Sequence, residues 1–313
     1  MTLKTRTAAG CLWLAAAPLL AGGAAATPLK ASDLLSGYNL ITGGSVSQGQ
    51  DIEGKAIIGG SLSGSGTFFN NNVPTAPSVS VYGSVSGNFN LNAGGNLYVG
   101  GAVSGNINYN GGGKLVPGGP VQPITDYTSP LAQLANNLAS LTNNGSYTTA
   151  NNTLTFKTSG TGVSVIVLKG SALDAAMASV SNIAFSIGPG VSSVIIDVLA
   201  DNGTTFTEPS GTNWNGSPLR DVLFNFIGYS KVTVGNWQSS LMAEGATVAI
   251  ANGAINGTVV AQSFTGGGEL HNYTFTGALP DFAAVPEPAS AGLIAMAGVA
   301  LTGWLRRRRR APR

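Results

Sequence analysis

The sequence predicts a mainly β protein: a right-handed β-solenoid body with one flanking α-helix, between an N-terminal signal peptide and a C-terminal transmembrane helix. Three observations lead to this fold class. Short runs of alternating apolar residues end repeatedly in glycines, which permit tight corners. The chain has 45 glycines and only 9% charged residues, which is unusual for a globular domain. One stretch in the middle changes to the leucine spacing of a helix.

Residues 1–26 have the pattern of a secretory signal peptide. Lys4 and Arg6 give the positive start, and residues 11–20 form the apolar stretch that follows. Small residues at 24–26 then offer a cleavage site before Thr27. The apolar stretch is too short to span a bilayer. We therefore expect the export translocon and signal peptidase as partners.

The body, residues 27–281, begins with a repeated unit of the form Gly-Ser-apolar-Ser. Its copies follow one another after 16, 23 and 18 residues and begin at Gly44, Gly60, Gly83 and Gly101; the fourth copy has Ala102 in place of the first serine. One unit cannot bury its own apolar face, so the units are expected to stack into a solenoid with a thin continuous core. A related rhythm joins residues 240–243 to residues 258–261. The unequal spacing leaves a β-sandwich as the alternative.

A helix is expected at about residues 130–142, where Ser129 is a suitable N-cap and Pro130 suits the first helical position. The leucines of this segment share one face: Leu131, Leu134, Leu138 and Leu141. This stripe is expected to pack along the flank of the solenoid, and Asn143-Asn144-Gly145 provides a stop. A second, shorter helix at residues 172–180, capped by Ser171, is an open alternative.

The body carries a small negative charge once the two ends are set aside. Between Thr27 and Val285 there are 7 basic and 12 acidic residues, a net charge of −5, although the whole chain has a formal charge of +2. The body has no basic cluster, so nucleic acid is not expected as a partner. The single cysteine, Cys11, lies in the signal peptide. The exported body is therefore expected to fold without disulfides.

Three elements follow one another at the C-terminus. Residues 282–288 form a linker with the motif Pro286-Glu287-Pro288, and residues 289–305 form an apolar run that is close to the length of a transmembrane helix. Residues 306–313 form a basic tail with five consecutive arginines: Arg306, Arg307, Arg308, Arg309 and Arg310. Because clustered positive charge stays on the cytoplasmic side, we expect a stop-transfer anchor with the body outside.

The ordered motif, helix and basic tail resemble the PEP-CTERM sorting signal. This resemblance implies that an exosortase-type membrane protease cleaves near Pro286-Glu287-Pro288 after a transient stay in the inner membrane. The product would then reach the cell surface or the extracellular matrix. A permanent single-span anchor is the alternative.

The sequence offers few residues for catalysis or metal binding. His271 is the sole histidine, and no Gly-x-Ser-x-Gly elbow stands before a helix, so no enzyme is expected. Asp51 and Glu53 alternate along a predicted strand, about 7 Å apart. Asp197 and Asp201 offer further oxygen ligands but match no calcium-binding loop. Ca²⁺ at these four carboxylates stays an open alternative, and no other cofactor is expected.

The body itself resembles the choice-of-anchor A family of bacterial surface proteins from about Leu34 to Pro280. The matching stretches are Tyr38-Asn39-Leu40, residues 51–54 and residues 57–60 near the start, and residues 255–261, 268–272 and Phe275 near the end. The resemblance implies an adhesive or matrix role for one body carried on alternative anchors, of which PEP-CTERM is one. It brings no catalytic residues with it.

We therefore predict an exported, non-enzymatic surface or matrix protein whose partner is exopolysaccharide or another cell's surface. Trp214, in a polar loop, is the candidate ligand contact, since an exposed aromatic ring can stack on a sugar. One alternative is a polysaccharide-active enzyme on a β-helix, which needs a groove lined by carboxylates. Another is an ice-binding protein, to which the expected helix-flanked β-helix is similar in fold alone. That function needs a flat face of spaced threonines, and no threonine repeats at coil spacing in the sequence.

Overall fold

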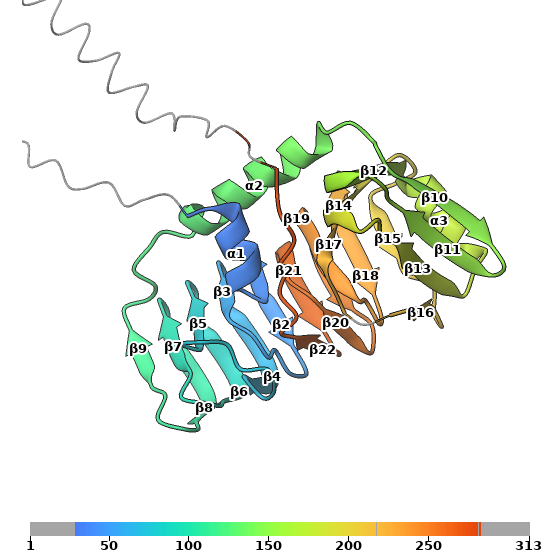
Figure 1. Cartoon of the computed structure of the whole chain (residues 1–313). Helices are drawn as coiled ribbons and strands as arrows, with labels where there is room; N and C mark the ends of the chain where they lie inside the picture. The colour runs from blue at the N-terminus through green and yellow to red at the C-terminus, as the bar shows by residue number, and fades with distance from the viewer. Residues whose placement is uncertain (1–28, 217, 281, 283–313) are drawn as a thin grey trace, which may run out of the picture.

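Parallel strands make up most of the protein, shown in Figure 1 as a computed structural model that describes residues 29–216, 218–280 and 282. A 16-stranded sheet curls into a half-barrel, beside a four-stranded and a two-stranded sheet. The prediction of a mainly β body is thus confirmed. The predicted signal peptide, transmembrane helix and basic tail lie outside the described residues. Within the described part of the chain, no helix combines the length and the apolar character needed to cross a bilayer.

The first nine strands form the N-terminal stack, in which the chain alternates between two rows of parallel strands. The helix-side row consists of β1 (Leu40–Thr42), β3 (Ala56–Ile58), β5 (Ser78–Val81), β7 (Asn96–Val99) and β9 (Leu115–Pro117). The open row consists of β2 (Val46–Gln48), β4 (Leu62–Phe68), β6 (Val85–Leu91) and β8 (Val103–Tyr109). Each repeated Gly-Ser unit stands where the chain turns from the helix-side row into the open row. The repeat therefore marks a corner, as its glycines predict.

Three glycines in the open row have a conformation that other residues rarely adopt. Gly64, Gly87 and Gly105 align in register on β4, β6 and β8 and have φ of +109°, +128° and +105°. A Cβ at Gly87 would lie 1.9 Å from the carbonyl oxygen of Gly64. Each strand therefore passes so close to its neighbour at this point that only glycine fits.

Helix α2 (Thr125–Ala139) carries the chain back along the helix-side row (Figure 1). The predicted leucine stripe is confirmed for Leu131, Leu134 and Leu138, which are buried against that row, whereas Leu141 lies beyond the end of the helix at Ala139 and is only partly buried. The predicted start is wrong: the helix begins at Thr125, and Ser129 and Pro130 lie inside it. Packing explains the extra turn. Tyr127 is buried there, with its ring edge-on to Tyr38 at 6.0 Å between centroids.

Two shorter helices accompany α2: α1 corrects the prediction of a single flanking helix, and α3 confirms the open alternative of a second, shorter helix. Helix α1 (Ala31–Gly37) has too few residues for a periodic pattern, yet it buries Leu34 and Leu35 in the core that α2 shares. Helix α3 (Gly170–Ala178) begins before the expected range, so Ser171 lies inside it and is not its cap. One N–H group of its first turn finds an acceptor in a distant loop, since Ser171 N donates to Asp201 Oδ1 at 2.8 Å.

The second half of the chain forms the C-terminal stack, which begins at the far end of the molecule. Its helix-side row contains β12 (Thr161–Lys169), β14 (Gly190–Leu199), β17 (Leu219–Ile227), β19 (Ser239–Ile250) and β21 (Val259–Gly266). Its open row contains β15 (Thr205–Thr207), β18 (Lys231–Val234) and the later parts of β19 and β21. The four-stranded sheet contains β10 (Ser146–Ala150), β11 (Thr153–Lys157), β13 (Asn182–Ser186) and β16 (Asn213–Trp214). The two-stranded sheet contains β20 (Ala254–Asn256) and β22 (Glu269–His271).

The two stacks meet at a seam where β21, near the end of the body, pairs with the first two strands, β1 and β2. Strand β21 pairs with β1, where Val259 faces Leu40, and with β2, where Phe264 faces Val46. The chain thus starts in the middle, builds outward to β9, returns along α2 and fills the other half back to the seam. Asn39, fully buried, joins the parts: its Nδ2 donates to the carbonyl oxygen of Gly257 at 2.7 Å.

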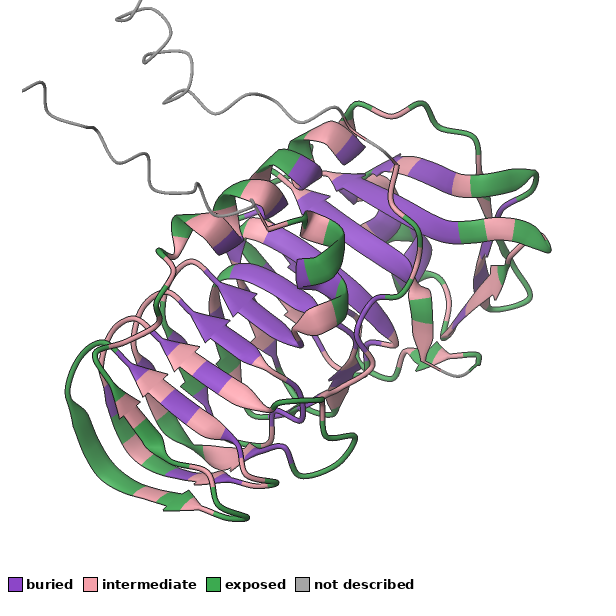
Figure 2. Ribbon diagram, turned by 60° about the vertical axis from the view of Figure 1, so that its left-hand side comes forward, coloured by how far each residue is buried: buried purple, intermediate pink, exposed green. Residues whose placement is uncertain are grey.

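Buried residues follow one another along most of the sheet, whereas the strands at its outer end, β8 and β9, have no buried residue (Figure 2). Buried apolar side chains of both stacks belong to one core cluster. The largest buried residues include Trp237, Phe206 and Phe224, whose rings meet in the C-terminal stack. All strand pairs described in the 16-stranded sheet are parallel. A β-sandwich is built from antiparallel sheets, so the structure does not favour that alternative.

Candidate binding face

Hydroxyl side chains form a line across the open row of strands that one alanine interrupts. The strand registers align, in order, Thr207, Thr233, Ala249, Thr265, Ser47, Ser63, Ser86 and Ser104. We call these eight residues the hydroxyl row; only Ala249 lacks a hydroxyl, and none of them is buried. Because neighbouring strands lie about 4.8 Å apart, the row is a regular array about 34 Å long.

The serines next to this row hold consecutive coils together. Ser45 Oγ accepts a hydrogen bond from Ser61 N at 3.1 Å, and Ser61 Oγ accepts one from Ser84 N at 3.1 Å. The same contact recurs from Ala102 N to Ser84 Oγ at 3.2 Å. These serines are the second residues of the repeated units, and Ser47, Ser63, Ser86 and Ser104 of the hydroxyl row are the fourth. The repeat therefore encodes both a coil-to-coil bond and an outward hydroxyl.

Asparagines extend the polar surface further along β6 and β8. Asn108 Nδ2 donates to Asn90 Oδ1 at 2.8 Å, and Asn110 Nδ2 donates to Asn92 Oδ1 at 2.8 Å. Such ladders fix the orientation of each amide from one coil to the next. Across the described strands of the open row, including the later parts of β19 and β21, Lys231 is the only charged residue. The face is therefore ordered, polar and almost neutral.

This arrangement corrects one expectation from the sequence. Thr207 and Thr233 stand on neighbouring strands, and Thr265 stands two strands beyond Thr233. Threonines therefore do recur on one line, although no regular sequence spacing reveals it. The sequence does not reveal the row, because the number of residues between its successive members varies within each stack and because the row continues from one stack into the other at the seam.

The four carboxylates considered for Ca²⁺ do not come together as one site. Asp51 Oδ1 accepts a hydrogen bond from Thr67 N at 2.9 Å, and Glu53 Oε2 accepts one from Asn272 N at 3.1 Å. Asp51 thus holds the end of β4, and Glu53 holds the residue that follows β22. In the described part of the chain, no group of three or more His, Cys, Asp or Glu residues could hold a metal ion. Ca²⁺ binding stays a prediction.

Asp201 and Asp197 have opposite environments. Asp201 is bound to the N-terminus of α3, and the hydrogen bonds from Ser171 lower the pKa of its carboxyl group. Asp197, on β14, is fully buried. Burial raises its pKa to about 6, although Asn225 Nδ2 donates to its Oδ1 at 2.7 Å. Its Oδ2 has no hydrogen-bond partner among the described residues.

Trp214, the predicted ligand contact, is half-buried at the edge of the aromatic core. Its ring lies 4.7 Å from that of Trp237, measured between centroids, and its Nε1 donates to Glu208 Oε1 at 3.0 Å. The other oxygen of Glu208 accepts a hydrogen bond from Gly235 N at 2.6 Å, and burial raises the pKa of this carboxyl group. Glu208 was not predicted, because a lone acid in a polar loop carries no pattern. Contact between Trp214 and a ligand stays a prediction.

His271 is held by polar neighbours on the two-stranded sheet. Its Nδ1 faces Asn256 Oδ1 at 2.5 Å, and its Nε2 faces Glu269 Oε2 at 2.8 Å. Neither ring nitrogen is bonded to a serine hydroxyl, which a Ser-His-Asp hydrolase would need. This geometry agrees with a structural role.

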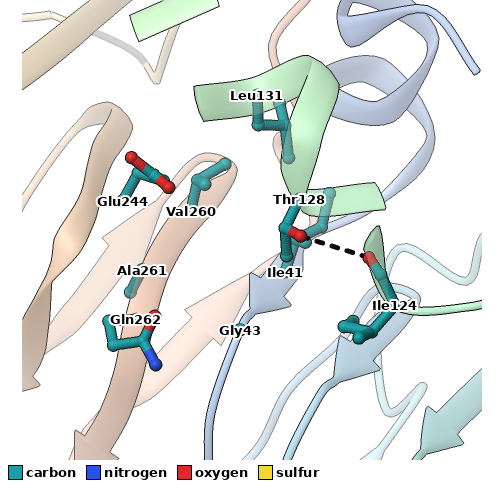
Figure 3. Close-up of a pocket in the computed structure, with 9 residues that line it drawn as sticks. All are labelled: Ile41, Gly43, Ile124, Thr128, Leu131, Glu244, Val260, Ala261 and Gln262. Atoms are coloured by element: carbon teal, nitrogen blue, oxygen red, sulfur yellow. Dashed lines mark hydrogen bonds between the residues drawn. The ribbon is translucent and has the colours of Figure 1, made fainter. Parts of the chain in front are cut away.

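Two hollows lie on the described surface close to α2 and to the hydroxyl row. One, of about 200 Å³, lies between α2 and the strands beneath it, where Thr128 Oγ1 donates to the Ile124 carbonyl oxygen at 3.3 Å (Figure 3). Glu244 lines this hollow, and burial raises the pKa of its carboxyl group. The other, of about 330 Å³, lies at the ends of β15, β18 and β19, where the hydroxyl row begins. The predicted sorting residues Pro286, Glu287 and Pro288 and the arginines Arg306–Arg310 lie outside the described residues.

Comparison with known proteins bears on this face. Residues 31–272 match the model of a family described as a putative ice-binding-like adhesive domain. The match covers both stacks, α2 and the whole hydroxyl row. Searches of curated proteins and of solved structures gave no match.

Proposed function

The chain belongs to the family of ice-binding-like adhesive domains, and from that membership we propose that it is a non-enzymatic adhesive protein of the bacterial surface or extracellular matrix. The observation that carries the proposal is the hydroxyl row. It gives one face of the molecule a regular set of donors and acceptors over both stacks. A rigid array of this kind suits a partner with its own repeating polar groups. Exopolysaccharide or the surface of another cell is such a partner.

Adhesion without catalysis agrees with the lack of free carboxylates on the described strands of the open row. A hydrolase of polysaccharides needs two carboxylates across one groove. Asp51 and Glu53 are instead engaged with backbone N–H groups, and the open row carries no carboxylate in its described strands. We therefore favour binding over the alternative of a polysaccharide-active enzyme.

We further propose that the chain is a choice-of-anchor A protein with a PEP-CTERM signal. In this account, signal peptidase removes residues 1–26 after export, and the helix at residues 289–305 holds the protein until an exosortase-type protease acts at Pro286-Glu287-Pro288. The ordered C-terminal triple supports this route. Replacing the motif by three alanines should leave unprocessed protein in the inner membrane. Normal delivery to the surface would contradict the proposed route.

The body is best classed, in our proposal, as a right-handed β-solenoid. The support is the alternation of the chain between two parallel rows, with each coil stacked on the next. Parallel strands joined by crossovers are nearly always right-handed.

Ice binding is the second candidate function, because Thr207, Thr233 and Thr265 stand on one line of a rigid face. The two candidates separate in one comparison. Adhesion predicts that bacteria producing the protein attach to polysaccharide-coated surfaces at 25 °C and that a deletion strain does not. Ice binding predicts that the purified protein partitions into growing ice. Partition into ice without any loss of attachment in the deletion strain would favour the second function.

A further inference from the structure

The hollow at the start of the hydroxyl row is built from three turns that follow adjacent parallel strands. Residues 208–213 follow β15, residues 235–236 follow β18 and residues 251–253 follow β19. Together they enclose about 330 Å³, which is within the range of small-ligand sites. Thr207 and Thr233 of the hydroxyl row belong to its lining.

Hydrogen bonds between the protein's own residues fix the walls of this hollow. Glu208, 8% exposed, bonds the loop to the neighbouring turn through Gly235 N and to the core through Trp214 Nε1. Thr212 Oγ1 closes the loop on itself by donating to the Pro209 carbonyl oxygen at 2.8 Å. Both oxygens of the Glu208 carboxylate are thus engaged by the protein. The acid serves to fix the shape of the hollow, which lowers the ordering cost of binding.

The groups left for a ligand are neutral. The side chains of Thr207, Thr233 and Asn252 form no hydrogen bond with any described residue. Asn236 Oδ1 accepts a hydrogen bond from Ala254 N at 3.3 Å, which leaves its Nδ2 group available. The described lining contains no Lys, Arg or His. Hydroxyls and amides both donate and accept hydrogen bonds, as the hydroxyls of a sugar do, whereas a phosphate, sulfate or uronate would lack a cation here.

We propose that this hollow binds one residue of a neutral polysaccharide and that the rest of the polysaccharide continues along the hydroxyl row. The inference rests on the proposed adhesive function and names the chemistry of its partner. Thr207 and Thr233 belong to both features, so a chain seated in the hollow is directed onto the row.

The test uses soluble oligosaccharides and isothermal titration calorimetry on the purified protein. The neutral probes are hexamers of cellulose, starch and chitin, and the charged probe is a hexamer of galacturonic acid. At least one neutral hexamer should bind with Kd below about 1 mM, and the charged hexamer should bind more weakly. Thr233→Val and Asn252→Ala should each weaken binding by about 5-fold or more, the loss of about one hydrogen bond.

The control is Gln133→Ala on the outer surface of α2, which should bind like the unmodified protein. Circular dichroism and thermal melting establish that each variant is folded. Equal affinity of the two hollow variants and the unmodified protein would overturn the proposal, as would preference for the charged hexamer or failure of every neutral hexamer to bind. If cells that produce the protein still attach while the deletion strain does not, these results refute ligand binding in the hollow alone. If the deletion strain also attaches normally, the proposed adhesive function is refuted as well.

Discussion

Replacing the buried carboxylate of Asp197 by an amide should change how the stability of the protein depends on pH. Asp197 is fully buried between β14 and α2, and Asn225 Nδ2, which donates to it, also donates to the Ala135 carbonyl oxygen of α2. Among the described residues, no positive group offsets its charge, since the causes of its shifted pKa are burial and the Asn225 hydrogen bond. Asp197→Asn preserves the shape of the side chain and removes the charge.

The magnitude follows from the shift in pKa. Burial raises the pKa of Asp197 from 3.8 to about 6. One pKa unit corresponds to about 1.4 kcal/mol, so ionisation of the folded protein costs about 3 kcal/mol of stability. Because the folded pKa is the higher one, this cost is absent below pH 3.8 and grows as the pH rises through about 6. At pH 7.5 the variant should therefore be the more stable, by up to about 3 kcal/mol.

The assay is urea unfolding of both proteins at pH 4.5, 6 and 7.5. The difference between their unfolding free energies cancels the titration of every other group that both proteins share. That difference should grow with pH in favour of Asp197→Asn. Asp33→Asn, at an exposed position on α1, is the matched control and should show no such growth. A difference independent of pH, or one that grows toward acid, would refute the reasoning.

Three further predictions concern the seam, the corners and α3. Asn39→Ala should lower the free energy of unfolding by about 3 kcal/mol, because it leaves Gly54 N and the carbonyl oxygens of Gly257 and His271 without their hydrogen bonds to Asn39. Denaturant titration measures this loss. The control, Asn106→Ala on the exposed face of β8, should change the free energy of unfolding by less than about 0.5 kcal/mol. Gly87→Ala should lower the free energy of unfolding by more than about 2 kcal/mol, because its Cβ would overlap the carbonyl oxygen of Gly64. Gly37→Ala, which has open space around it, should leave this free energy nearly unchanged in the same titration. Equal effects of the two substitutions would contradict the argument. Asp201→Ala should lower Tm at pH 7, and the loss should shrink as the pH falls, because hydrogen bonds from Ser171 lower the pKa of Asp201 and its contribution disappears on protonation; a loss in Tm that is equal at pH 7 and pH 3 would be inconsistent with this role.

Local features of the fold could be predicted because each depends on residues close in sequence. The Gly-Ser units indicate corners, since a tight turn needs only a few neighbouring residues. The leucine stripe of α2 indicates a helix that lies on an apolar surface. The start of α2 could not be predicted in the same way, because the contact between Tyr127 and Tyr38 decides it. Similarly, the cap of α3 comes from Asp201, 30 residues beyond Ser171.

The candidate site depends on contacts of much longer range. Asn39 and Gly257, which meet at the seam, are 218 residues apart. Without that seam, Thr265 and Ser47 belong to unrelated segments, and the hydroxyl row breaks into two short pieces. The serines of the hydroxyl row are the fourth residues of the repeated units, so this half of the row can be inferred from the repeat. The threonine half could not, because its coils have no common unit.

The most direct test of the adhesive face places positive charge at its centre. In Ser47→Lys/Ser63→Lys, two ammonium groups stand on neighbouring strands of the neutral hydroxyl row. The matched control, Gln133→Lys/Asn136→Lys, adds the same charge on the exposed surface of α2. Attachment of cells that produce each variant at equal surface levels is then counted on polysaccharide-coated surfaces. Our account predicts that the first variant loses attachment and the second keeps it; equal attachment of the two would contradict it.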